Sequence, residues 1–320
     1  MQNRFLPFIA AACLIAVAPL SAADEPLRIV TSIKPLSLLA RAIAPEDTQI
    51  TTLIPAGASP HTYQLRPSDR RALAEADLIL WVGPSMETFM QRLLENPELA
   101  PRTQSLMPTE EAQIAHEHEH EHAHAEEVGH EEHPGHDHGD GHHHDGVDPH
   151  VWLDPALALL MTHTIGDRLA KLAPNQHDVI ERRLKQLEHA LHAQDEQLRP
   201  SLARLEGIDI FTYHDAFGRF AEHYGIHLAG ALTPSPEQTP GARHINAIQQ
   251  KLRGANHPCL LTEPQFNRDW WQSLTEDVGL TISTWDPLAS EIPETPDGYV
   301  KFQQSLADAA LTCLPEQAQH

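Results

Sequence analysis

The sequence is poor in basic residues. It has 22 Lys and Arg against 45 Asp and Glu, which gives a formal net charge of −23 over 320 residues. Because nucleic acid is bound largely through Lys and Arg placed against phosphates, this balance excludes nucleic acid as an expected partner. The deficit is uneven, since residues 110–148 hold thirteen acidic residues and no Lys or Arg. The rest of the chain carries a formal charge of about −10 and therefore offers no basic surface either.

The N-terminal apolar run is short for a membrane span. Arg4 is followed by an apolar stretch over residues 5–20 and by the small residues Ser21, Ala22 and Ala23. This order predicts a signal peptide over residues 1–23, cleaved near Ala23, and a protein exported to a bacterial periplasm. Cys13 lies in the middle of the run, and no lipobox surrounds it, which argues against a lipoprotein.

Cysteine is scarce. Only Cys259 and Cys313 remain once the predicted signal peptide is removed. In an oxidising compartment an even pair is more often a structural disulfide than a reactive centre, and two buried free thiols are the alternative. The sequence therefore favours a disulfide between these two residues.

Histidine, in contrast, is abundant and concentrated. The acidic segment shows no apolar periodicity. It holds twelve of the 24 histidines: His116, His118, His120, His122, His124, His130, His133, His136, His138, His142, His143 and His144. Without an apolar face to bury, residues 110–148 are predicted to be a disordered loop. Imidazole is a common ligand of transition metals, so the loop is expected to hold several weak, auxiliary metal sites.

Strand and helix patterns alternate on both sides of this loop. Strand patterns lie at 27–33, 49–54, 78–82, 208–213, 226–231, 258–262 and 280–285, and helical patterns at 36–43, 66–76, 87–94, 155–172, 215–224, 240–252, 267–278 and 299–311. Such alternation predicts an α/β protein with mostly parallel sheets flanked by helices.

Residues 175–205 have a different pattern. Their apolar residues recur mostly three or four positions apart, which predicts one helix roughly 45 Å long. A helix of this length in the middle of the chain suggests a connection between two lobes. We expect an N-terminal lobe at 24–172, a linking helix at 173–206 and a C-terminal lobe at 207–320.

Three histidines outside the loop lie next to predicted strand or helix ends. His61 follows the strand at 49–54, His150 precedes the helix at 155–172, and His214 follows the strand at 208–213. Open α/β sheets bind ligands at the carboxyl ends of their strands, and Asp286 occupies a similar position after the last predicted strand. Three imidazoles with a carboxylate or water suit four-coordinate Zn(II). For any one of these residues alone, a capping or core role is the alternative.

Several longer strings carry a family resemblance. GASPHTYQLRPSD, ADLILWVGPSMETFM, DPHVWLDP, TYHDAFGRFAEHYGI, TEPQF and WDPL occur in this order. The chain resembles the zinc-uptake members of the metal-binding solute-binding proteins of ABC importers, over essentially the whole predicted mature sequence. The resemblance implies two lobes joined by a rigid long helix with the metal in the cleft.

The resemblance also implies roles for individual residues. His61 and His150 from the first lobe and His214 from the second would bind the metal, with Asp286 supplying a carboxylate as in some relatives. Cys259 and Cys313 match positions of a disulfide. Manganese-type relatives generally have a glutamate where this sequence has His214, so a histidine there favours zinc over manganese. A related protein selective for manganese or another divalent metal is the alternative.

The expected function is capture of Zn(II) and its delivery to an inner-membrane ABC permease with a cytoplasmic ATPase. A periplasmic zinc chaperone is a further candidate partner, and we expect a monomer. A zinc-dependent hydrolase is the competing hypothesis, because residues 116–120 match H-E-x-x-H. That motif requires a packed helix with apolar neighbours, which the repeat lacks, and no general base stands out beside the three histidines. We therefore do not expect an enzyme.

Overall fold

The computed structural model describes residues 25–109, 148–233, 240–266, 275 and 278–315. The predicted signal peptide, the twelve histidines of residues 116–144 and most of the helix predicted at 267–278 lie outside these residues. Within them, no helix combines the length and the apolar character needed to cross a membrane.

The N-terminal sheet has four parallel strands in the order β2-β1-β3-β4. These are β1 (Arg28–Thr31), β2 (Gln49–Thr52), β3 (Leu78–Trp81) and β4 (Thr103–Ser105), accompanied by helices α1 (Lys34–Ile43), α2 (Pro67–Glu75) and α3 (Gln91–Leu94) and the short η1 helix (Ala100–Arg102). Strand β4 was not predicted, because its three polar residues carry no apolar pattern.

Helix α3 is shorter than the helix predicted at 87–94. The reason lies in Glu87, which is buried and accepts hydrogen bonds from the backbone N–H groups of Val82 and Gly83 just after β3. These bonds hold Glu87 in the turn that follows the strand, so regular helix begins only at Gln91.

The C-terminal sheet repeats this architecture with four parallel strands in the order β6-β5-β7-β8. Its elements are β5 (Ile210–His214), β6 (Leu228–Thr233), β7 (Cys259–Thr262) and β8 (Thr281–Thr284), with helices α7 (Gly218–Tyr224), α8 (Ala242–Gly254) and α10 (Gly298–Leu311). A disulfide joins Cys259 in β7 to Cys313 just after α10, which confirms the predicted bridge.

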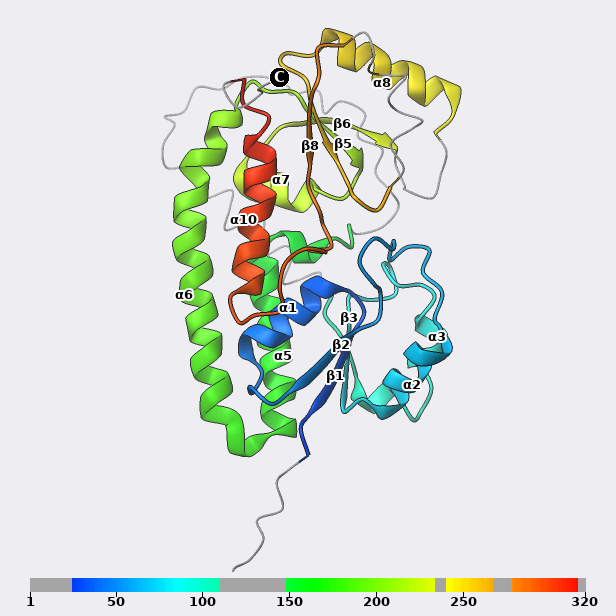
Figure 1. The fold of residues 1–320 in the computed structure, drawn as a ribbon, viewed down its shortest axis with the longest axis vertical. Coiled ribbons are helices and arrows are strands. Elements are labelled where there is room, and N and C mark those ends of the chain that lie inside the picture. Colours follow the sequence, from blue (N-terminus) through cyan, green and yellow to red (C-terminus); the bar gives the residue numbers. More distant parts are fainter. Residues whose placement is uncertain (1–24, 110–147, 234–239, 267–274, 276–277, 316–320) are drawn as a thin grey trace, which may run out of the picture.

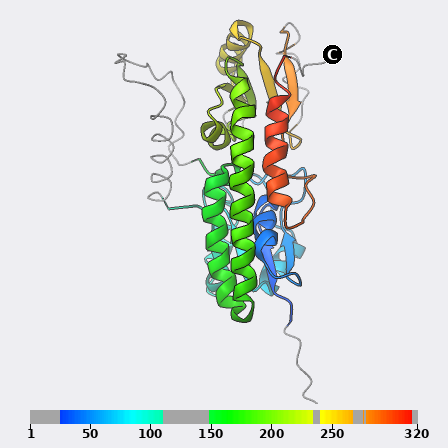
Figure 2. The ribbon, with the colours of Figure 1, turned by 90° about the vertical axis from the view of Figure 1, so that its left-hand side faces the viewer.

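Helix α6 (His177–Leu202) connects the two lobes, as predicted, and is flanked by the short helices η3 (Pro174–Gln176) and η4 (Ala203–Leu205). It runs along one side of both lobes (Figure 1), and α5 (Pro155–Leu172) and α10 pack beside it (Figure 2). Its apolar stripe is buried at Ile180, Leu187, Leu191, Leu198 and Leu202. Because α10 also packs on α1, the C-terminal helix returns to the N-terminal lobe.

Direct hydrogen bonds also cross between the lobes around the short helix η2 (Val151–Leu153). The indole of Trp152 donates to the carbonyl of Pro287 at 2.8 Å, and the Tyr299 hydroxyl donates to the carbonyl of Trp152 at 2.7 Å. Trp152 and Tyr299 are both fully buried. The segment just after His150 is therefore fixed by residues of the C-terminal lobe.

Candidate metal centre

Three histidines from separate parts of the chain meet between the lobes. One ring nitrogen from each of His61, His150 and His214 lies within 4.8 Å of the others. The ring centroids are 5.4–6.0 Å apart. Nitrogens bound at 2.0–2.1 Å to a tetrahedral zinc lie roughly 3.3 Å apart, so small side-chain adjustments suffice to hold one ion. Among the described residues, this is the one group of three or more His, Cys, Asp or Glu whose ligand atoms gather in this way.

His214 is positioned by the C-terminal sheet. It is the last residue of β5, and the parallel register that pairs Thr212 with Leu261 places it beside Glu263, just after β7. The Glu263 carboxylate lies 2.6 Å from Nδ1 of His214, and Glu263 is only 2% exposed. When Nδ1 carries the proton, it donates to Glu263, and Nε2 is the nitrogen available to a metal.

His150 is positioned by the loop that leads into η2. Its backbone N–H donates to the Asp148 carboxylate at 3.0 Å, and its Nδ1 lies 2.7 Å from the same oxygen. Burial would raise the pKa of Asp148, but the hydrogen bond and the charge of His150 outweigh it, so that the pKa is lowered. The ionised carboxylate fixes the ring of His150 in the same manner as Glu263 fixes His214.

His61 lies on the loop after β2. Gly57 has φ +79°, a conformation that favours glycine, and the His61 backbone N–H donates to the Ser59 hydroxyl at 3.3 Å. Among the described residues, no hydrogen bond to the His61 ring is found, and the side chain is only partly buried. His61 is therefore the least constrained of the three histidines.

The electrostatics of the group favour a neutral ring at His61. Burial, followed by the positive charges that His150 and His214 would carry, lowers the pKa of His61 from 6.5 to about 3, and Asp148 opposes this only weakly. A neutral imidazole is the form that binds a metal. At neutral pH no proton has to leave His61 before an ion can bind.

Eight further residues line the pocket that holds the three histidines. They are mostly apolar or aromatic and come from both lobes: Ser59, Pro60, Trp152, Glu263, Gln265, Phe266, Pro287 and Leu288. Phe266 packs edge-on against His214, with ring centroids 5.5 Å apart. Such a lining strengthens the electrostatic interactions of an ion inside it.

Asp286, the candidate for the fourth ligand, makes other contacts in this structure. One of its oxygens accepts from the Gln265 amide at 2.6 Å and from the Leu288 backbone at 3.0 Å, and the other accepts from the Ser290 backbone at 2.6 Å. Asp286 does not belong to the group of ligand atoms formed by the three histidines. In this arrangement its carboxylate holds the loop after β8.

Asp148 and Glu263 are the carboxylates that contact the ring nitrogens of His150 and His214. Asp148 was not singled out, although it stands two residues before His150. Glu263, for which the sequence suggests a structural or supporting role, contacts Nδ1 of His214, whereas Asp215, a capping or orienting candidate next to His214 in sequence, is exposed. The parallel pairing of β5 with β7 is the signal that could have pointed to Glu263.

Known proteins are similar to this chain in sequence and in fold. The family model described as zinc-uptake complex component A, periplasmic, matches residues 29–313. The chain is 35% identical to the high-affinity zinc uptake system protein ZnuA of Yersinia pestis, with 98% of this chain and 99% of that protein covered. It is 33% identical to the ZnuA of Haemophilus ducreyi, with 90% and 93% covered.

Solved structures show the same architecture. A crystal structure of ZnuA matches with a TM-score of 0.66 and 22% identity, covering 89% of this chain and all of that one. The laminin-binding protein Lmb of Streptococcus agalactiae matches with a TM-score of 0.71 and 18% identity, covering 92% and 100%. At these identities the structures establish the fold, whereas the family match rests on sequence over nearly the whole chain. The chain therefore belongs to the family of periplasmic zinc-uptake complex component A proteins.

Proposed function

We propose that this protein captures Zn(II) in the periplasm and delivers it to an inner-membrane ABC permease, which a cytoplasmic ATPase drives. The observation that carries the proposal is the meeting of three buried or partly buried imidazoles, contributed by both lobes, with ligand atoms within 4.8 Å of one another. The protein is the solute-binding component of a zinc importer and not an enzyme, in keeping with its family. Zinc is its cargo and undergoes no chemical change.

The ligand set supports zinc over manganese. His61, His150 and His214 offer three nitrogen donors, whereas manganese prefers carboxylate and carbonyl oxygens. Asp286 remains our candidate for the fourth ligand. To reach the ion, its carboxylate would have to exchange at least the Gln265 contact for the metal. Water is the alternative fourth ligand, and it would leave the loop after β8 unchanged.

Other parts of the proposal concern residues or partners outside the described structure. We propose that residues 1–23 are a signal peptide cleaved near Ala23 and that the histidine-rich segment 110–148 supplies weak auxiliary sites. The protein would act as a monomer, and a periplasmic zinc chaperone is a further partner to be sought. Ordering a segment that has no apolar face to bury costs conformational entropy, so the tight site should be the three histidines of the described structure and not segment 110–148.

A zinc titration against a competing chelator tests the proposal, with intact mature protein compared with a form lacking residues 110–146. We expect both forms to retain one tight zinc and the intact form to bind additional, weaker ions. If the deletion removes the tight zinc, the loop is the receptor and the three-histidine site is wrong. Steady turnover of a hydrolase substrate by the deleted form would instead support the enzymatic alternative.

A further inference from the structure

Two basic side chains of α7 face the two carboxylates that bracket His150. Nε of Arg219 lies 3.9 Å from an Asp148 oxygen, and Nδ1 of His223 lies 3.4 Å from an Asp154 oxygen. Residues four apart lie on the same face of a helix, so both contacts come from one face of α7. Helix α7 begins four residues after His214. The two contacts therefore connect the element that follows one histidine of the site to the segment that carries another.

The Asp154 contact is buried and has a second function. Asp154 caps α5, because one carboxylate oxygen accepts from the backbone N–H groups of Ala156 at 2.7 Å and Leu157 at 3.2 Å. Asp154 is 4% exposed and His223 is 5% exposed. In such surroundings a charged contact is stronger than in water, and removing one partner leaves the other without its compensation. Asp154 thus joins the start of α5 to the end of α7.

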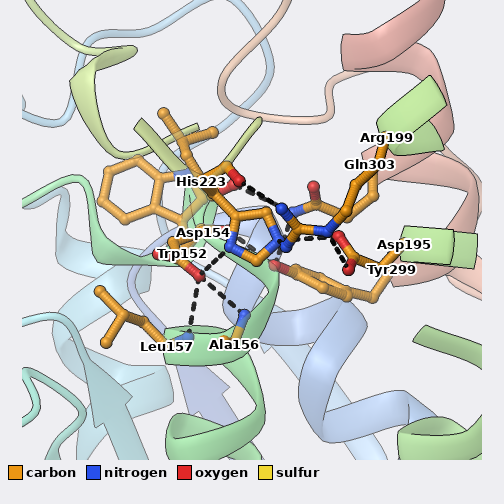
Figure 3. Close-up of polar contacts among 10 residues, drawn as sticks. Trp152, Asp154, Ala156, Leu157, Asp195, Arg199, His223, Tyr299 and Gln303 are labelled. Atoms are coloured by element: carbon orange, nitrogen blue, oxygen red, sulfur yellow. Dashed lines mark hydrogen bonds and ion pairs between the residues drawn. The ribbon is translucent and has the colours of Figure 1, made fainter. Parts of the chain in front are cut away.

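On its other side His223 is held by the linking helix α6. Nε2 of His223 lies 2.8 Å from an Asp195 oxygen, and the other Asp195 oxygen accepts from Nε of Arg199 at 2.8 Å. Arg199 also donates to the backbone carbonyl of His223 at 3.0 Å. Figure 3 shows His223 between Asp154 and Asp195, with Arg199 beside it. Helix α7 is therefore fixed both to α6 and to the segment after His150.

We propose that Arg219 and His223 are positioning residues for metal binding. They hold residues 148–154 against α7 and so set the separation between His150 and His214, two ligands that come from different lobes. The inference rests on the proposed zinc-binding function. Fixing these two ligands in advance lowers the cost of ordering them around an ion, and the expected consequence is slow release of zinc. His61, on a loop outside these contacts, would then complete the site.

The test measures zinc dissociation after mixing the loaded mature protein with excess chromogenic chelator. We expect His223→Gln and Arg219→Gln to release zinc about 10–100-fold faster than the wild type, the range typical of lost supporting contacts at metal sites. Arg219→Lys keeps the charge opposite Asp148 and should recover most of the wild-type rate. Asp195→Asn, which weakens the hold of α6 on His223, should give an intermediate rate.

His163→Gln is the matched control. His163 also pairs with a carboxylate, since its Nε2 lies 2.8 Å from Glu188 of α6, but this pair joins α5 to α6 and does not involve α7. Its zinc dissociation rate should equal that of the wild type. Thermal unfolding of the metal-free variants separates positioning from general stability, because a purely structural role would lower the melting temperature and leave the dissociation rate unchanged.

Two results would overturn the inference. The first is a wild-type dissociation rate in both Arg219→Gln and Asp195→Asn, which decides the matter even if His223→Gln fails to fold. The second is equal release from Arg219→Lys and Arg219→Gln. Failure of the proposed zinc-binding function would be recognised separately, because the wild-type protein itself would then bind no zinc tightly.

Discussion

The carboxylate of Glu263 lies 2.6 Å from Nδ1 of His214, at the point where the adjacent parallel strands β5 and β7 end. Both residues are buried, so this contact fixes which ring nitrogen of His214 faces the site. Asp148 makes the corresponding contact with His150 at 2.7 Å. Each of the two buried histidines of the candidate metal centre thus has its own carboxylate.

Glu263→Gln should lower zinc affinity about 10–100-fold, because the amide is a weaker acceptor for the Nδ1 proton and no longer favours charge on the imidazole–metal unit. Competition titration with a chelator measures the change. Glu206→Gln, at an exposed position, is the control and should bind zinc like the wild type. An unchanged affinity of Glu263→Gln would show that the contact does not tune the site.

Replacing His61, His150 or His214 by Ala, one at a time, should remove tight zinc binding. Loss of a direct ligand should cost more than loss of an orienting partner, so we expect affinity to fall by more than roughly 100-fold. The same titration is the measurement. His189→Ala and His192→Ala, both exposed on α6, should leave the tight site intact. Wild-type affinity in any of the three site variants would remove that residue from the ligand set.

Asp286→Asn distinguishes a carboxylate from water as the fourth ligand. If Asp286 binds the ion, its replacement by a neutral amide should weaken zinc binding about tenfold or more, because a charged donor is lost. Gln265→Ala is the companion variant, since it frees the Asp286 oxygen that accepts from the Gln265 amide and should not weaken binding. Unchanged affinity in Asp286→Asn would assign the fourth position to water.

The Cys259–Cys313 bridge should stabilise the C-terminal lobe. It closes a loop with a sequence separation of 54 residues and connects the buried strand β7 to the end of α10. Replacing both residues by Ala should lower the free energy of unfolding by about 2–5 kcal/mol. Urea unfolding with and without reductant measures it, and the double variant should be insensitive to reductant. Two free thiols in freshly purified protein would contradict the bridge.

The metal-free protein should lose stability as the pH is lowered. The pKa of His61 falls from 6.5 in the unfolded chain to about 3 in the folded one, chiefly through burial. Between these values the unfolded chain binds a proton that the folded chain excludes, so the free energy of unfolding decreases as the pH falls through this window.

Urea unfolding at pH 7, 6, 5 and 4 measures this dependence. His61→Gln should reduce the slope of stability against pH, because the residue that excludes the proton is gone. His192→Gln, at an exposed histidine, should keep the wild-type slope. An identical slope in His61→Gln and the wild type would show that His61 does not contribute.

Much of the fold could be predicted because its signals are local. The helix at 155–172 coincides with α5, and the three-and-four spacing of buried leucines predicted α6 to within a few residues at each end. Prediction failed where a contact outside the pattern decided the structure. Because Glu87 accepts hydrogen bonds from the backbone just after β3, regular helix in α3 begins only at Gln91. Strand β4 is too short and too polar to be recognised from the sequence.

The same distinction between local pattern and distant contacts applies to the candidate metal centre. The α/β class, the linking helix and the three histidines beside strand or helix ends could be predicted from local pattern, because side-chain periodicity and residue type are properties of neighbouring residues. Local pattern could not show that Glu263 contacts His214, that Asp286 holds its own loop, or that His223 lies between Asp154 and Asp195. Those relationships join residues distant in the chain, and they exist because strand register and helix packing bring buried charges together.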